Sequence, residues 1–236
     1  MGKKSYGQFC PVAKTAEVLA ERWMPLVLRE LLAGSRHYSE LRRGIPLISP
    51  AVLSQRLKEL VDAEVVERVR APGAGERWEY RLTEAGQELR PIIRAFGEWG
   101  QRWAQHELRP EEVDPDFLMW AMHRRLNPEA LPGQPTVLLF ELPDVEIRRR
   151  RFWFVVAKGE VDICLKSPGL DVDLTITAGI RTLTRIYLGQ IEPGDAIRSG
   201  SVALEGARPL IRNFPSWCPR SPFAAAARRL VVAPAK

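Results

Sequence analysis

The stretch "ISPAVLSQRLKELVDAEVVER", residues 48–68, contains a helix start, an apolar stripe and a change to strand spacing. Ser49 is suited to cap the helix, and Pro50 is suited to its first position because the first turn leaves that N–H unpaired. Three leucines recur at helical spacing and therefore share one face: Leu53, Leu57 and Leu60. The pattern predicts a short helix that packs on a core through these leucines.

The opposite face of this helix carries small and polar side chains: Ala51, Ser54, Gln55 and Lys58. An ordinary solvated helix face would explain this composition. A surface that contacts another molecule would explain it as well, and the segments on either side of the helix decide between the two.

Apolar residues at helical spacing predict three helices before residue 48, the third of them short. After the helix, 65–70 and 77–82 alternate as strands joined by a glycine-containing turn, and 83–108 is predicted as one long helix. This order is that of a winged helix-turn-helix, in which the helix after the turn enters the DNA major groove and the hairpin lies along the backbone. The polar face is therefore predicted to contact DNA.

These residues resemble the HxlR family of bacterial transcriptional regulators, which are related to the MarR group. The resemblance runs from about Phe9 to Trp103 and rests on "CPV" (10–12), "RWMPLVLRELLAGSRHYSELRR" (22–43), the opening stretch and "YRLTEAGQEL" (80–89). It implies a homodimer, paired through the terminal helices of the winged domain, that binds a roughly palindromic operator in double-stranded DNA. The chain departs from the family at Glu64, where a glycine is usual.

The predicted DNA contacts fall into two groups. On the helix, Ala51, Ser54, Gln55 and Lys58 are predicted to face the bases, Gln55 being suited to adenine, and Ser49 with the helix N-terminus to hold a phosphate. Basic residues around the helix are predicted to contact the backbone: Arg43, Arg70 and Arg77. A solvated or ion-paired role remains the alternative for each of these arginines.

Cys10 matches the N-terminal cysteine that some HxlR-type regulators use to detect oxidants or electrophiles. Lys14 lies one helical turn away and would favour the thiolate. A small, buried interface residue is the alternative role for Cys10.

The second half of the chain alternates apolar and polar residues along five segments: 136–142, 150–157, 160–166, 171–177 and 201–206. Val161, Ile163 and Leu165 are predicted to face one side of a sheet. In the next segment Val172 begins a similar alternation. The pattern predicts an antiparallel sheet that is apolar on one face, covered by helices at 116–127, 179–188 and 193–198, and therefore an α+β domain.

Residues 171–206 resemble the sterol-carrier type of lipid-binding domain in their order of strand, helix with a late Gly189, short helix and "SGSVALEG". The resemblance covers about 115–230 and implies a cleft for an apolar molecule. Candidate lining residues are Phe152, Phe154, Ile180, Leu183, Tyr187 and Trp217. A filled core is the alternative for this set, and Tyr187 is the member that adds a hydroxyl group.

Length and composition limit the other possibilities. The 236 residues carry a formal net charge of +6, and 27% of them are charged, which is typical of a globular protein. The proline-rich, acidic segment 108–116 predicts two domains, 1–110 and 111–236. No apolar run approaches the roughly 20 residues of a membrane span. Three scattered cysteines fit a cytoplasmic protein.

No phosphate-binding loop, nucleophile elbow, zinc spacing or cofactor motif is present in the sequence. The chain is therefore predicted to be no enzyme and to need no cofactor or metal. The predicted function is that of a DNA-binding repressor or activator, modulated by an apolar small molecule in the second domain. Two alternatives stay open: a carrier of lipid or apolar ligand whose winged domain mediates assembly, and a redox-sensing regulator acting through Cys10.

Overall fold

The computed structural model describes residues 5–70, 78–104, 108–133 and 135–227. The chain forms two compact units, Met1–Phe96 and Gly97–Lys236. The division falls within helix α6 (Arg90–Trp99), before the proline-rich segment 108–116.

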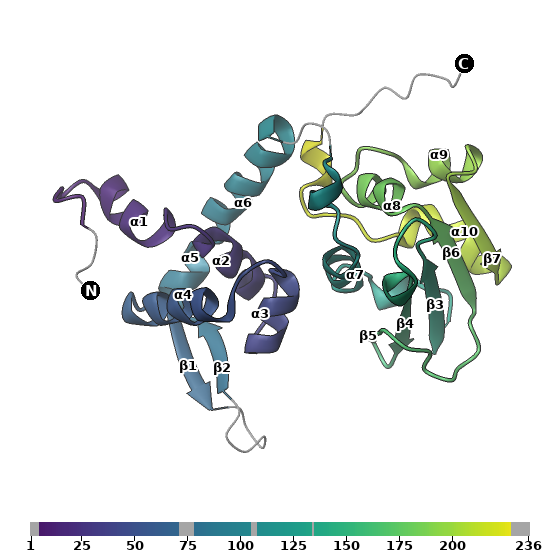
Figure 1. Ribbon diagram of the computed structural model, residues 1–236, viewed down its shortest axis with the longest axis horizontal. Helices are drawn as coiled ribbons and strands as arrows, with labels where there is room; N and C mark the ends of the chain where they lie inside the picture. Colours follow the sequence, from purple (N-terminus) through teal and green to yellow (C-terminus); the bar gives the residue numbers. More distant parts are fainter. Residues whose placement is uncertain (1–4, 71–77, 105–107, 134, 228–236) are drawn as a thin grey trace. The chain divides into compact units, whose positions relative to one another are not determined.

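The helices of the first unit follow one another as α1 (Pro11–Leu19), α2 (Met24–Leu32), α3 (Tyr38–Gly44), α4 (Pro50–Asp62) and α5 (Glu84–Glu88) (Figure 1). Between α4 and α5, β1 (Val66–Arg70) and β2 (Trp78–Leu82) form an antiparallel hairpin. The prediction of a helix-turn-helix region followed by a hairpin is confirmed.

The prediction of one unbroken helix over 83–108 is wrong. Helix α5 ends at Glu88 and α6 begins at Arg90, with Pro91 in its first turn. Proline cannot donate to the carbonyl one turn earlier and its ring clashes there, so it belongs near a helix start. Beyond Trp99 the chain continues as a π-helical turn, η1 (Gly100–Ala104).

Helices α1, α2, α3, α4 and α6 and the hairpin surround one core, which contains the leucines of α4. Among the described residues of this unit, two other than glycine have a positive φ: Trp23 at 78° and Glu64 at 57°. This left-handed region brings Cβ close to the backbone and costs an L-residue about 1–2 kcal/mol. Glu64 thus adopts, just after the end of α4, a backbone conformation that favours glycine.

The second unit is built on a five-stranded sheet in the order β5-β4-β3-β6-β7. Its strands are β3 (Thr136–Glu141), β4 (Arg151–Ala157), β5 (Glu160–Cys164), β6 (Leu174–Ala178) and β7 (Val202–Gly206). Its α-helices are α7 (Pro115–His123), α8 (Ile180–Tyr187), α9 (Pro193–Arg198) and α10 (Arg208–Trp217). Short 3-10 turns complete it: η2 (Pro110–Glu112), η3 (Pro128–Ala130), η4 (Ile147–Arg149) and η5 (Ala224–Ala226).

The sheet is mixed, so the prediction of a purely antiparallel sheet is wrong. Strands β3 and β6 run parallel, with Leu138 opposite Leu174, while the other neighbours are antiparallel. The chain leaves β5 at one edge and returns to the centre of the sheet beside β3. Alternation of apolar residues reports which face of a strand is buried, not the direction of its neighbour.

One face of the sheet forms the core of this unit. Along β4, Phe152, Phe154 and Val156 are buried while Trp153 and Val155 are half-buried. Side chains from α7, α8 and α10 join the same core: Leu118, Met119, Met122, Ile180, Leu183, Ile186, Leu210, Phe214 and Trp217.

Two predicted inward residues lie outside the strands. Leu165 follows the end of β5 and is 64% exposed, and Val172 precedes β6 and is 38% exposed. The alternating pattern in sequence is thus longer than the strands it marks.

Candidate nucleic-acid interface

Helix α4 begins as its sequence predicts. The Ser49 hydroxyl accepts a hydrogen bond from the backbone N–H of Val52 at 3.3 Å, and Pro50 occupies the first helical position. The leucine stripe is sealed in the core: Leu53, Leu57 and Leu60 are at most 1% exposed.

The opposite face of α4 is open to solvent. Ala51, Ser54, Gln55 and Lys58 are all exposed. Gln55 donates from Nε2 to Oε1 of Glu59 at 2.9 Å, and the Lys58 ammonium lies 3.2 Å from the Asp62 carboxylate. The Lys58–Asp62 pair is exposed, so its members can exchange partners at little cost.

The turn that leads into α4 is fixed by contacts that the sequence did not reveal. The Tyr38 hydroxyl donates to the carbonyl of Pro50 at 2.9 Å. A Cβ atom at Gly44 would lie 1.9 Å from Oε2 of the buried Glu30, so a larger residue does not fit there. Arg29 donates to Glu30 at 3.0 Å and to the Gly44 carbonyl at 2.7 Å. The sequence feature that could have revealed these contacts is Glu30 itself, a charged residue within the apolar run of α2.

Two arginines of the β1–β2 hairpin make cation–π contacts with one tryptophan ring. The guanidinium carbons of Arg68 and Arg70 lie 4.2 Å and 5.5 Å from the ring centroid of Trp78. All three side chains are exposed, as is Arg43 in α3. Arg77 lies outside the described residues. Arg68 and Trp78 were missed from the sequence, although an arginine two positions before Arg70 on a strand shares its face.

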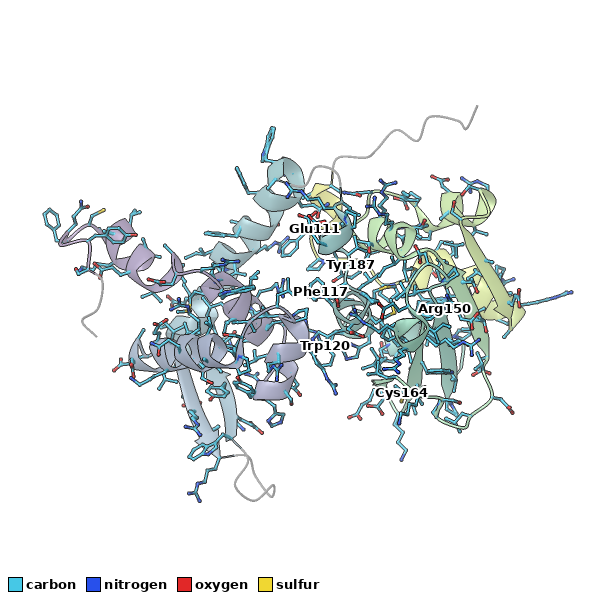
Figure 2. The ribbon with its side chains drawn as sticks, viewed as in Figure 1. Glu111, Phe117, Trp120, Arg150, Cys164 and Tyr187 are labelled. Carbon is cyan, nitrogen blue, oxygen red and sulfur yellow. The ribbon has the colours of Figure 1, made fainter. Side chains whose placement is uncertain are left out.

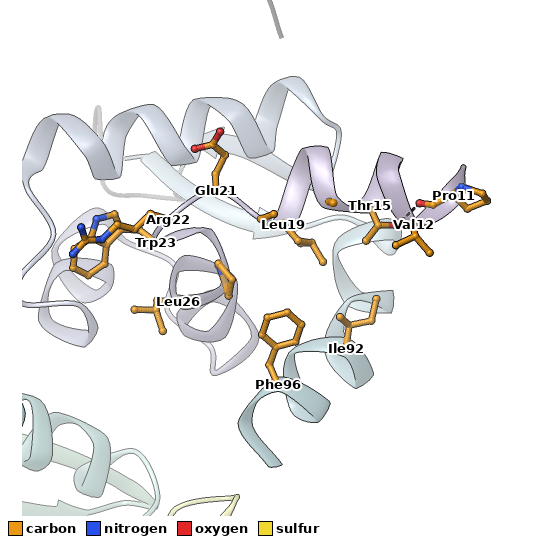
Figure 3. Close-up of a pocket in the computed structure, with 13 residues that line it drawn as sticks. Pro11, Val12, Thr15, Leu19, Glu21, Arg22, Trp23, Leu26, Ile92 and Phe96 are labelled. Atoms are coloured by element: carbon orange, nitrogen blue, oxygen red, sulfur yellow. Dashed lines mark hydrogen bonds between the residues drawn. The ribbon is translucent and has the colours of Figure 1, made fainter. Parts of the chain in front are cut away.

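An apolar cavity of about 750 Å³ lies between α1, the start of α2 and α6 (Figure 3). Its apolar lining includes Pro11, Val12, Ala16, Leu19, Trp23, Pro25, Leu26, Ile92 and Phe96. Several large apolar side chains around it are unusually open: Val12 is 76% exposed and Phe96 57%. We call this feature the α1–α6 groove.

Cys10 immediately precedes α1 and is half-buried. Its carbonyl accepts from the backbone N–H of Lys14 at 3.1 Å. The Lys14 ammonium pairs with Glu17 at 3.2 Å. Hydrogen bonds from the Ser5 hydroxyl and the Tyr6 N–H, in that order, hold the pKa of Glu17 below its usual value.

The candidate ligand-binding residues of the second unit are packed in its core. Phe152, Phe154 and Leu183 are fully buried; Trp217 is 3% exposed and Ile180 8%. Tyr187, labelled in Figure 2, lies at the end of α8 and is half-buried. Cys218 belongs to this core, and burial raises the pKa of its thiol to about 12.

Within the described ranges, no group of three or more His, Cys, Asp or Glu residues is arranged to hold a metal ion. Nor does that part of the chain contain a helix with the length and apolar character needed to cross a membrane.

Comparison with known proteins identifies the family of the first part of the chain. A family model described as HxlR-like helix-turn-helix matches residues 18–108. The HTH-type transcriptional regulator YvaP of Bacillus subtilis is 38% identical over 112 residues, covering 47% of this chain and 95% of YvaP. The HTH-type transcriptional regulator YodB of the same organism is 33% identical over 97 residues, covering 41% of this chain and 87% of YodB.

Among solved structures, the redox regulator HypR in its reduced form is 32% identical and covers 39% of this chain and 91% of its own, with a TM-score of 0.36. The family match ends at residue 108 and so does not describe the five-stranded sheet. The relatives are regulators of transcription rather than enzymes. The chain therefore belongs to the HxlR-like helix-turn-helix family of DNA-binding transcriptional regulators.

Proposed function

We propose that the chain binds an operator as a homodimer, as a repressor or activator, with α4 in the major groove. One observation carries this proposal: α4 buries its leucines and leaves Ala51, Ser54, Gln55 and Lys58 exposed along one face. A recognition helix needs such a face, because the bases are distinguished by hydrogen-bonding groups and methyl contacts at the groove floor.

Each side chain of this face has a role that suits its chemistry. Gln55 donates and accepts, which matches the edge of adenine, and the Ala51 methyl suits contact with thymine. Ser49 uses its oxygen to cap α4, which leaves its hydroxyl proton for a phosphate at the helix N-terminus. Arg43, Arg70 and Arg77 would position the DNA backbone.

The test is the variant Gln55→Ala. We expect it to weaken binding to an operator selected by the wild-type chain by about 1–3 kcal/mol and to relax one base position. Gln87→Ala is the matched control, because Gln87 is exposed on α5 and pairs with Arg90. Unchanged affinity and selectivity in Gln55→Ala would show that this face of α4 does not face the bases.

A second copy of the chain is the proposed occupant of the α1–α6 groove. Exposed Phe96 and Val12 offer apolar area that solvent disfavours, and aromatic side chains are typical of interface centres. Trp99 continues the exposed aromatic pattern of α6 at 63% exposure. The terminal helices would thereby pair two recognition helices for half-sites about one DNA turn apart.

For the second domain, taken as 111–236 beside a DNA-binding domain 1–110, we propose a sterol-carrier-type role in sensing an apolar molecule. The support is a sheet with helices packed on its apolar face and the half-buried Tyr187 beside it. Two other roles compete with it: a purely structural domain with a filled core, which we call the structural role, and a carrier of apolar ligands. The burial of Phe152 and Phe154 favours the structural role.

A thermal-shift screen of fatty acids, sterol-like compounds and aromatic acids tests this role, followed by operator titration with each hit. A sensing domain requires a ligand that both stabilises the chain and changes operator affinity. If a ligand stabilises the chain but the chain binds no specific DNA sequence, the protein is a carrier. If no compound stabilises the chain, the structural role remains.

Redox sensing by Cys10 is a second candidate function. The observation that favours it is position: Cys10 directly precedes Pro11, which lines the α1–α6 groove. Oxidation there would alter the proposed dimer contact. Operator affinity of wild type and Cys10→Ser is measured with and without diamide, and an equal response in both excludes Cys10 as the switch.

A further inference from the structure

Arg56 occupies a half-buried position on α4, one residue after Gln55, with a side chain 15% exposed. All three nitrogens of its guanidinium are used. Nε donates to the carbonyl of Arg22 at 3.0 Å, Nη2 to the Glu21 carboxylate at 3.1 Å, and Nη1 to the carboxylate of Glu59.

Glu59 joins Arg56 to Gln55. One of its oxygens accepts from Arg56 and the other accepts from the Gln55 amide at 2.9 Å. Burial alone would raise the pKa of Glu59, but hydrogen bonds from Gln55 and Arg56 outweigh it and the pKa lies below its ordinary 4.5. Glu59 is therefore ionised at neutral pH and holds the donor end of Gln55.

The other end of this chain of contacts is the corner between α1 and α2. Glu21, Arg22 and Trp23 form it, and all three line the α1–α6 groove, with Glu21 pointing away from Phe96 in Figure 3. The carbonyl that Arg56 binds belongs to the residue before Trp23, whose φ is 78°. The guanidinium of Arg22 covers the Trp23 ring at 5.1 Å.

We propose that Arg56 is a positioning residue that connects the base-contacting Gln55 to the α1–α2 corner. A contact that fills the α1–α6 groove would then change how strongly α4 prefers its operator over other DNA. The proposal rests on the role of Gln55 given above. Coupling of this kind is reciprocal, so operator binding would also strengthen whatever contact fills the groove. Lysine cannot replace Arg56, because one ammonium does not span three fixed acceptors in the guanidinium plane.

The first test needs no DNA and uses the full-length chain. Glu21→Ala removes the corner's carboxylate, 34 positions before Gln55 in sequence, and is expected to shift the NMR signal of the Gln55 side-chain amide. Glu17→Ala is the matched control, since Glu17 lies on α1 and pairs with Lys14 rather than Arg56. A Gln55 amide signal that stays in place in folded Glu21→Ala overturns the proposal.

A second measurement in the same experiment follows the carboxylate itself. Arg56→Lys is expected to raise the pKa of Glu59 towards 4.5, measured by carbon NMR of the carboxyl group, because the paired guanidinium is lost. An unchanged Glu59 pKa in this variant counts equally against the proposal.

The third measurement is selectivity, the ratio of affinities for the DNA selected by the wild type and for random duplex. We expect Glu21→Ala to lower it about three- to tenfold, typical of coupling between sites. The double variant Glu21→Ala/Gln55→Ala is expected to lose little more selectivity than Gln55→Ala alone. Arg56→Lys is expected not to retain the selectivity of the wild type, although it keeps the positive charge. Fully additive losses overturn the proposal. A wild-type chain that selects no sequence refutes the proposed function, while the two measurements on the free protein still decide whether Arg56 positions Gln55.

Discussion

The α1–α6 groove of the first unit and the sheet core of the second place aromatic side chains in opposite environments. In the first, Phe96 is 57% exposed beside an apolar groove, and in the second, Phe140, Phe152 and Phe154 are completely buried in the sheet core. A large exposed apolar patch is typical of an interaction surface, whereas buried aromatic rings stabilise the unit that contains them. The difference therefore points to contacts made by the first unit and to packing in the second.

Phe154→Ala has the largest expected effect and examines the second half of this comparison. If the ring is core, the variant loses about 3–5 kcal/mol of the free energy of unfolding, because a cavity replaces a large side chain. Denaturant titration measures the loss. A variant that keeps its stability but changes ligand binding would show that Phe154 lines an open cleft.

The thiol of Cys218 reports how well the same core is sealed. A pKa of about 12 in place of the ordinary 9.0 lowers the thiolate fraction at neutral pH about a thousandfold, so iodoacetamide is expected to label half-buried Cys10 and Cys164 well before Cys218. Because the pKa of Cys218 is higher in the folded than in the unfolded chain, its contribution to the free energy of unfolding is complete below pH 9 and is lost as the pH rises towards 12. Cys218→Ala should remove that alkaline loss, and rapid labelling of Cys218 in the folded chain would show an open core.

Phe96→Asp examines the first half of the comparison. A charge in the α1–α6 groove is expected to weaken the proposed dimer by about 2 kcal/mol, roughly thirtyfold, with little effect on the unfolding of the monomer. Sedimentation equilibrium measures the change. Ile147→Asp, at an 81% exposed position of the second unit, is the control. A dimer that survives Phe96→Asp unchanged must pair elsewhere.

The arginines predicted to contact the DNA backbone provide a more sensitive test of the contacts made by the first unit. Alanine variants of Arg43, Arg70 and Arg77 are each expected to lower the salt slope of DNA binding by about one unit per monomer, the contribution of one phosphate contact. Arg198→Ala removes an exposed arginine paired with Asp195 in the second unit and should leave the slope unchanged. Three unaltered slopes would remove these arginines from the interface.

Glu64→Gly has the smallest expected effect. Glycine at this left-handed position relieves the Cβ contact, and we expect a gain of about 0.5–1 kcal/mol in the free energy of unfolding. Thermal unfolding at neutral pH measures it. A loss of stability would mean that the Glu64 side chain makes a contact worth more than the strain.

Local patterns in the sequence predicted local structure well. The face of α4 that holds Leu53, Leu57 and Leu60, and its opposite polar face, follow directly from the helical period. The cap at Ser49 follows from the chemistry of a hydroxyl at a helix start.

What the sequence did not reveal depends on residues that are distant along the chain. Arg56 shows no unusual local pattern, since Glu21 and Arg22 that bind it lie 35 and 34 positions earlier. The parallel pairing of β3 with β6 was missed for the same reason, because alternation does not report strand direction. Pro91 was visible, and its effect on the helix 83–108 could have been predicted.

The parallel seam between β3 and β6 also divides the sheet of the second unit into two halves, each continuous in sequence. The antiparallel strands β3, β4 and β5 form one half, and β6 with α8, α9 and β7 forms the other. At the seam the Val137 N–H donates to Asp173, 36 positions away, so the seam closes at a higher entropic cost than the pairings within β3–β4–β5. The connection between the halves carries exposed Leu165 and Leu170, which makes it accessible to a protease. A single cut there would leave two fragments, each with a sheet edge complementary to the other.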